Sequence, residues 1–151
     1  MKNLFEEKAA QEAIDRINKL NASSTPQWGK MSVAQMLAHC SVAYEFVYDE
    51  SKYPKPNGFV RFLLKLFVKD AVVGAKPYKR HTRTAPDFLI VDERNFETEK
   101  KRLIDHITRT QKLGEDHFHN KESRSFGSLT KTEWNIMFSK HLDHHLTQFG
   151  V

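Results

Sequence analysis

Apolar residues recur at helical spacing over the first twenty positions of the chain. Residues three and four apart lie on the same side of a helix, so this recurrence predicts an amphipathic helix. The stretch 21–30 that follows is rich in Ser, Thr, Pro and Gly and predicts a loop. The apolar positions of this first predicted helix are Leu4, Phe5, Ala9, Ala13, Ile14, Ile17 and Leu20.

Two later segments begin with the pattern of a helix N-terminal capping box. Residues 32–35 read Ser-Val-Ala-Gln, and residues 130–133 read Thr-Lys-Thr-Glu. In a capping box the hydroxyl accepts from a free backbone N–H of the first turn, and the side chain three residues on accepts from the capping residue's own N–H. We therefore expect one helix from Ser32 to about Tyr48 and a last helix from Thr130 to Gln148.

A third helix is predicted from Asn95 to His117, with Phe96, Leu103, Ile107 and Leu113 on a common side. More than forty residues separate it from the helix before it. A connection of that length is too long for a tight antiparallel turn. The pattern thus predicts an all-α fold, a four-helix bundle with a long crossover between its second and third helices.

Part of this crossover, residues 59–73, is itself helix-like. Arg61, Lys65 and Lys69 form a basic stripe at i, i+4 and i+8, and most other positions are apolar. Such a wide apolar arc exceeds what one bundle face can cover. It could cover the end of the bundle, meet a second subunit as a homodimer, or touch a membrane surface. We favour a structural or dimer contact over a membrane contact.

Composition limits the class of protein. With 151 residues, 39% hydrophobic and 28% charged, the chain fits one soluble globular domain over residues 1–151, without stable membrane insertion. Acidic residues interrupt the first twenty positions, so no secretory signal is visible. The single cysteine, Cys40, cannot form an internal disulfide, which favours a reducing, cytoplasmic compartment.

The net charge of +5 is unevenly distributed. Residues 52–83 contain nine Lys or Arg and one acid, Asp70, giving +8 and leaving −3 for the rest of the chain. This segment holds few aromatic residues that would stack on bases, and no nucleic-acid recognition motif is present. We therefore expect no nucleic-acid partner.

The last predicted helix carries three histidines in five residues. His141 and His145 are one turn apart, about 40° from each other, on the side continued by Trp134, Met137 and Phe138. Two imidazoles at this spacing can bind one metal ion. Spacing alone is more typical of paired core histidines or of a solvated, histidine-rich helix end than of a metal site.

His39 is the candidate third ligand. It lies on the second predicted helix among apolar residues that include Met36, Ala43 and Phe46. Taken alone, it is typical of a hydrogen-bonded core histidine. If it faces the other two, three neutral ligands would leave a tetrahedral metal ion one open position.

These histidines belong to a wider pattern. Residues 28–39 read Trp-Gly-Lys-Met-Ser-Val-Ala-Gln-Met-Leu-Ala-His, followed by Phe126-Gly, by Glu133-Trp, and by His-x-x-His-His-x-x-Gln over 141–148. The combination resembles the DinB-like, or YfiT-like, metal-binding superfamily, most closely an uncharacterised bacterial branch. The resemblance implies a four-helix bundle with a divalent zinc, nickel or iron ion bound by His39, His141 and His145.

One departure concerns the end of this pattern. Many members of the superfamily read His-His-Arg-Gly-Gln where this chain has His144-His-Leu-Thr-Gln148, so the Arg and Gly are missing. His144 and Gln148 are candidates to support the ligands or to bind substrate. Arg80 and Arg83, in the basic crossover, are candidates for an anionic substrate. Cys40 lies about 100° from His39 and is expected to be a buried structural thiol.

The resemblance also implies a chemistry, because members of the superfamily include thiol S-transferases and a thiol-dependent isomerase. A metal ion held by neutral ligands lowers the pKa of a bound thiol or water. We therefore expect a small-molecule substrate, a low-molecular-weight anionic thiol transferred to an electrophile. The alternatives are hydrolysis of a small amide or ester, for which no Glu stands beside the histidines as a general base, and a non-catalytic metal-binding dimer.

Overall fold

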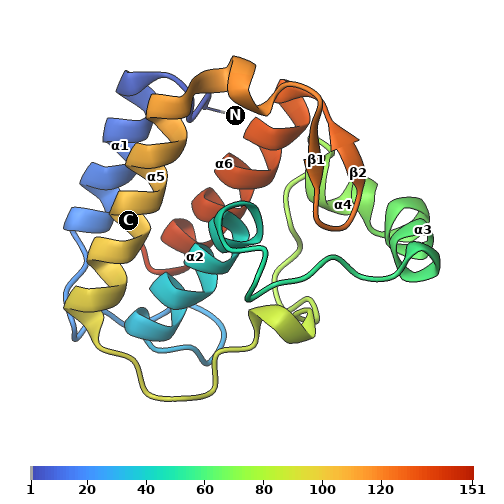
Figure 1. Ribbon diagram of the computed structural model, residues 1–151. Coiled ribbons are helices and arrows are strands. Elements are labelled where there is room, and N and C mark those ends of the chain that lie inside the picture. Colours follow the sequence, from blue (N-terminus) through green and yellow to red (C-terminus); the bar gives the residue numbers. More distant parts are fainter. Residues whose placement is uncertain (1) are drawn as a thin grey trace.

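The computed structural model describes residues 2–151, which are mostly helical (Figure 1). These residues form six α-helices, one short 3-10 helix and one two-stranded antiparallel sheet. The elements are α1 (Glu7–Asn18), α2 (Val33–Tyr48), α3 (Gly58–Phe67), α4 (Lys69–Val73), η1 (Pro86–Phe88), α5 (Phe96–Phe118), β1 (Lys121–Ser123), β2 (Gly127–Leu129) and α6 (Lys131–Gln148).

Both predicted capping boxes are present. The Ser32 side chain accepts from the backbone N–H of Gln35, and Thr130 does the same for Glu133, with the reciprocal bond formed in each case. Because these signals are local in sequence, they placed the starts of α2 and α6 correctly.

The four longest helices, α1, α2, α5 and α6, pack against one another. Helices α2 and α5 run parallel to each other. Three contacts show this, because the residue numbers of both partners increase in the same direction: Gln35 with Asp92 just before α5, Glu45 with Arg102, and Tyr48 with Thr110. Parallel neighbours cannot be joined by a short turn, which explains the long connection over residues 49–95.

The core lies between these four helices. Trp134, Tyr44, Phe118 and Phe138 are its largest fully buried side chains, and their rings stack or meet edge to face in a continuous row. Such aromatic pairs add about 0.5–1.5 kcal/mol each beyond the area that they bury. This row continues along α6 toward His141, so the histidines extend from a rigid part of the molecule.

The crossover differs from its prediction in one respect. Residues 59–73 form two helices, α3 and α4, because Val68 leaves regular helical geometry between them. The expected basic stripe is therefore not a free surface: Arg61 pairs with Glu122, and Lys69 pairs with Glu133 at 2.7 Å. Only Lys65 of the three has no ion pair within residues 2–151.

Two further details correct the sequence-based prediction. Leu113 is 38% exposed and does not join Phe96, Leu103 and Ile107 in the core. Leu113 is six residues after Ile107, which places it about 240° away around the helix axis and so on another side of α5. Gly114, with φ +73°, interrupts α5 immediately afterwards. The hairpin of β1 and β2 was not predicted, although Gly127, with φ +77°, marks its turn.

No helix within residues 2–151 is both long enough and apolar enough to cross a membrane.

Candidate metal centre

Three histidines from two helices meet beside the core. His39 comes from the middle of α2, and His141 and His145 come from successive turns of α6. One ring nitrogen from each lies within 4.8 Å of the other two. His39 and His145 are buried, whereas His141 is half-buried. The three residues picked out by the sequence are thus brought together.

The Nδ1 atom of His39 is already engaged. It lies 2.9 Å from the backbone carbonyl oxygen of Phe88, in η1, which can only accept a hydrogen bond. Nδ1 must therefore carry the proton and donate it. In the neutral ring this leaves Nε2 with a free lone pair, 2.9 Å from Nε2 of His141. The crossover thus fixes the ring of His39 and aims its acceptor nitrogen at α6.

His145 is fixed in the same manner by Gln148. The Nε2 amide group of Gln148 donates to the carbonyl oxygen of Trp28 at 2.6 Å, which assigns the side-chain amide's orientation. Its Oε1 then accepts from Nδ1 of His145 at 2.8 Å. The lone pair of His145 is again left on Nε2. Gln148, expected to help bind substrate or support the ligands, thus orients the ring of His145.

A glycine makes this arrangement possible. Gly29 has φ +85°, and a Cβ added there would lie 2.6 Å from Nε2 of Gln148. A side chain at this position would therefore displace the amide that orients His145. The sequence shows Gly29 inside the Trp-Gly-Lys segment but gives no sign of why it is needed.

Burial keeps the three imidazoles neutral. It lowers the pKa of His39 despite the hydrogen bond to Phe88, and it lowers the pKa of His145 to about 3. For His141, burial and then the neighbouring His39 and His145 lower the pKa well below 6.5. Neutral imidazole is the form that binds a metal ion.

The histidines open into a cavity of about 660 Å³. One wall is apolar and is formed by residues of α3, α4 and the residue between them, together with two phenylalanines: Val60, Leu64, Val68, Val72, Phe46 and Phe88. The cations lining the cavity are Lys30, Arg83 and Arg124. Of the described residues that line it, Asp87 is the one carboxylic acid, and its carboxylate pairs with Arg124 at 2.9 Å. The cavity therefore carries a net positive charge.

The remaining predicted site residues lie around this cavity. His144 is half-buried, with its ring against Trp28, Tyr78 and His145. Arg83 lines the cavity, whereas Arg80 stacks on the ring of Trp28 with its guanidinium carbon 4.1 Å from the ring centre. Cys40 is buried, as expected, and burial raises the pKa of its thiol.

Lys140 was missed by sequence reasoning. Its buried ammonium group donates to the carbonyl oxygens of Ala71, Gly74 and Lys76, at 2.9, 2.5 and 3.2 Å. It thereby ties the end of α4 and the chain after it to α6, one residue before His141. A lysine inside an apolar helix face is the signal that could have identified it.

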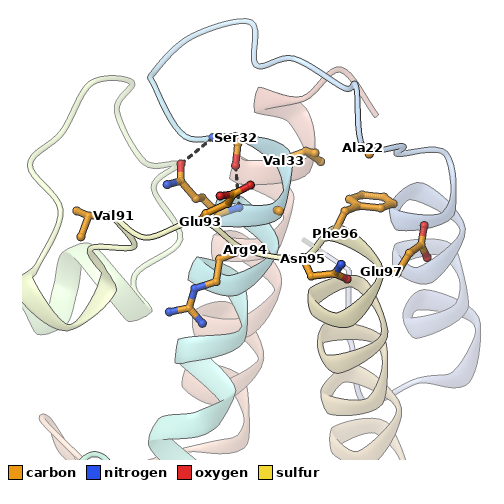
Figure 2. Close-up of a pocket in the computed structure, with 11 residues that line it drawn as sticks. Ala22, Ser32, Val33, Val91, Glu93, Arg94, Asn95, Phe96 and Glu97 are labelled. Carbon is orange, nitrogen blue, oxygen red and sulfur yellow. Dashed lines mark hydrogen bonds between the residues drawn. The ribbon is translucent and has the colours of Figure 1, made fainter.

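A second hollow, of about 680 Å³, lies where α2 and α5 begin (Figure 2). Two of its polar side chains cap helices: Ser32 caps α2, and Asn95 caps α5 by accepting from the backbone N–H of Thr98. No histidine or cysteine lines it among the residues described. It therefore offers capped helix ends and no ligand set.

The arrangement of the histidines fits a divalent cation. A tetrahedral centre with metal–nitrogen distances of about 2.1 Å holds its ligand nitrogens about 3.4 Å apart. The observed separations are 2.9 Å for one pair and at most 4.8 Å for the others, which is compatible with this value. Two of the three rings also have the anchored Nδ1–H that metal-binding histidines commonly show. These three side chains could therefore hold a metal ion.

Comparison with known proteins adds the family. A family described as "Protein of unknown function (DUF1569)" matches residues 2–150. No curated protein and no solved structure matches the sequence. Since the match covers nearly the whole sequence, the chain belongs to the DUF1569 family.

Proposed function

We propose that the protein binds one divalent metal ion through Nε2 of His39, His141 and His145. The observation that carries this proposal is the convergence of these atoms while Nδ1 of His39 and of His145 is held elsewhere. Three neutral ligands would leave a tetrahedral ion one position for substrate or solvent. Half-buried His141 lies on the cavity side, so that position would face the cavity.

The wider architecture supports placing the chain in the DinB-like superfamily. Four long helices pack together, a long crossover joins the parallel α2 and α5, and the histidines occupy the middle of α2 and the second half of α6. The superfamily resemblance rests on the same positions. The ion would then be zinc, nickel or iron, and a cytoplasmic location fits the lone, buried thiol of Cys40.

The cavity favours a small anionic substrate with an apolar part. Arg83 and Lys30 line it without an ion pair to another described residue, whereas Arg124 is already paired. The valines and leucine of α3 and α4 would pack against the apolar part. A low-molecular-weight thiol that carries carboxylates meets both requirements.

We infer that the reaction is transfer of this thiol to an electrophile. A divalent cation, when bound, lowers the pKa of a thiol that contacts it, so the thiolate forms near neutral pH. Arg83 and Lys30 would hold the carboxylates and orient the sulfur toward His141. Hydrolysis is the weaker alternative, because Asp87, the carboxylate that lines the cavity, is held by Arg124 and is poorly placed to act as a general base.

A screen of cysteine-containing thiols against aromatic halide and epoxide electrophiles tests this function. We expect thiol consumption by the purified protein, its loss after dialysis against a chelator, and its return with one equivalent of Zn²⁺, Ni²⁺ or Fe²⁺. His117→Ala serves as the control variant, because His117 is exposed on α5, away from the cavity.

The outcomes separate the candidates. Metal-dependent thiol transfer supports the proposal, and metal-dependent release of a small amide or ester without thiol consumption supports a hydrolase. One bound equivalent of metal with neither activity would identify a non-catalytic metal-binding protein. Turnover that survives complete metal removal would contradict the proposal.

A further inference from the structure

Helix α3 presents an apolar face that no other part of residues 2–151 covers. Phe59, Phe62, Leu66 and Phe67 are between 61% and 73% exposed, and Leu63 is 37% exposed. At 100° per residue these five side chains fall within an arc of about 140°. Such an arc is normally buried, so a binding partner is expected to cover it.

The opposite side of the same helix attaches it to the molecule. Leu64 is half-buried, and Val60 and Leu64 line the histidine cavity. The Arg61–Glu122 pair ties α3 to the hairpin, and α3 packs on α4. Figure 1 shows α3 at the edge of the molecule, beyond α4 and the hairpin. Its outward face is therefore accessible to another molecule.

The size of this face approaches that of a stable protein interface. A phenylalanine side chain can bury about 200 Å², so the three exposed rings alone present about 400 Å². A standard interface buries about 800 Å² on each partner. Leu63 and Leu66, together with the 39% exposed Val60 at the margin, supply part of the remainder.

The charges around this face favour a protein partner over a lipid surface. A helix that lies on an anionic membrane keeps its Lys and Arg free for the headgroups. Here Arg61 and Lys69 are paired with Glu122 and Glu133 of the same chain. Of the three cations of this segment, only Lys65 has no ion pair within residues 2–151, and it lies at the border of the apolar face. An aromatic centre without charges and a polar rim are typical of protein interfaces.

The order of the side chains along α3 indicates that the partner is a second copy of the same chain. Around Leu63 the face has nearly the same pattern in both directions, with Phe59 and Phe67 four residues to either side. Val60 and Leu66 lie three residues to either side. A two-fold axis through Leu63 would pair Phe59 of one chain with Phe67 of a second, antiparallel α3. Isologous contacts require such self-complementarity. We infer that the protein forms a homodimer through α3, with Leu63 at the two-fold axis.

The mass of the full chain in solution tests this inference. Light scattering or sedimentation equilibrium, at up to about 100 µM chain, should give twice the 17.6 kDa of one chain, because interfaces of this size reach micromolar or tighter affinity. The double variant Phe59→Ser/Phe67→Ser should be monomeric with an unchanged circular dichroism spectrum. Val91→Ser removes an 86% exposed apolar side chain outside α3 and should remain dimeric.

A single cysteine tests the register. In Leu63→Cys the two new thiols should face each other across the axis and form a disulfide-linked dimer under mild oxidation. Cys40 is buried and should not interfere. Val91→Cys is the matched control and should cross-link far more slowly.

Three results would overturn the inference: a monomeric wild type, a dimer unaffected by the double variant, or equal cross-linking of both cysteine variants. Wild type that is monomeric but sediments with phosphatidylserine vesicles would assign the face to a membrane instead. Metal content is independent of this test, because the histidines lie on α2 and α6. A failed dimer with intact metal binding would thus leave the proposed function standing.

Discussion

The two sides of α2 hold buried polar groups in different states. Toward α5, the Glu45 carboxylate is bound by Lys52 at 2.8 Å and by Arg102 at 2.9 Å, and Arg102 also binds Glu99. Toward α6, His39 meets two other histidines. Because His39 and His145 donate their N–H groups to Phe88 and Gln148, the three neutral rings have three lone pairs left and one remaining N–H. The first cluster pairs its buried carboxylates with cations of the same chain, whereas the second has lone pairs left over that could bind a metal ion. Both cost desolvation energy, but only the second leaves lone pairs open to a ligand from outside the chain.

The largest expected effect breaks the first of these clusters. Arg102→Met would remove the cation shared by the nearly buried carboxylates of Glu45 and Glu99, which keep Lys52 and Arg94 respectively. The loss of two charged hydrogen bonds should lower the free energy of unfolding by about 3 kcal/mol. Chemical denaturation measures the change. Lys101→Met, which removes a pair exposed to solvent, should change stability by less than about 1 kcal/mol. Equal losses in the two variants would show that the cluster is no stronger than a surface pair.

His141→Leu should change the stability of the metal-free protein little but should abolish its stabilisation by Zn²⁺. It removes the half-buried member of the triad, whose described hydrogen bond is to His39, so the metal-free protein should change by no more than about 1 kcal/mol. Saturating Zn²⁺ should stabilise wild type by about 3 kcal/mol at a hundred times the dissociation constant, and should not stabilise the variant. Thermal unfolding with and without Zn²⁺ measures both. Similar stabilisation of wild type and variant would remove His141 from the site.

Gln148→Leu tests the support of the triad. Losing the acceptor that orients His145 should weaken metal binding by about 10- to 100-fold while leaving the stoichiometry at saturation unchanged. Competition with a chromogenic chelator gives the affinity. Gln11→Leu, on the exposed side of α1, is the control. Unchanged affinity in Gln148→Leu would mean that the ring of His145 needs no anchor.

Gly29→Ala tests the position of the Gln148 side chain by placing a methyl group against it. The added Cβ and the φ of +85° should together cost about 1–2 kcal/mol and weaken metal binding in the same direction as Gln148→Leu. Gly58→Ala, where an added Cβ meets nothing within 4 Å, should do neither. A stability loss in Gly29→Ala without a loss of metal affinity would separate the loop from the site.

The smallest expected effect is the loss of stability in acid as the Glu45 carboxylate becomes protonated. Burial alone would raise the pKa of Glu45, but Lys52 and Arg102 outweigh it and hold the pKa below its usual 4.5. The unfolded chain therefore binds a proton first, so this contribution is complete above about pH 4.5 and is lost as the pH falls through the lowered pKa. Glu45→Gln should flatten the stability profile in this range. An unchanged profile would show that another group causes it.

The sequence predicted the features that depend on neighbouring residues. Both capping boxes, the limits of α2 and α6, and the pairing of His141 with His145 follow from spacings of three or four residues. His39 is about a hundred residues away from them. Its apolar neighbours made it a candidate, and the family resemblance joined it to the site. The anchors could not be predicted, because the carbonyl groups of Phe88 and Trp28 are backbone atoms with no signature in the sequence.

The crossover was the hardest part to predict. The pattern of apolar and basic residues over 59–73 fits one continuous helix, but the helix breaks at Val68. On either side of this break, Arg61 pairs with Glu122 of the hairpin and Lys69 pairs with Glu133 of α6. These partners are distant in sequence. The hairpin itself has strands of three residues, too short for the alternation that identifies a strand.

The most direct test of the metal site is the position of the ion. Crystals grown with Zn²⁺ and measured at the zinc absorption edge should show one anomalous peak per chain, about 2.1 Å from Nε2 of His39, His141 and His145. Nδ1 of His39 should remain bonded to the carbonyl oxygen of Phe88. A peak elsewhere, ligation through Nδ1, or no peak at full Zn²⁺ occupancy in solution would contradict the account.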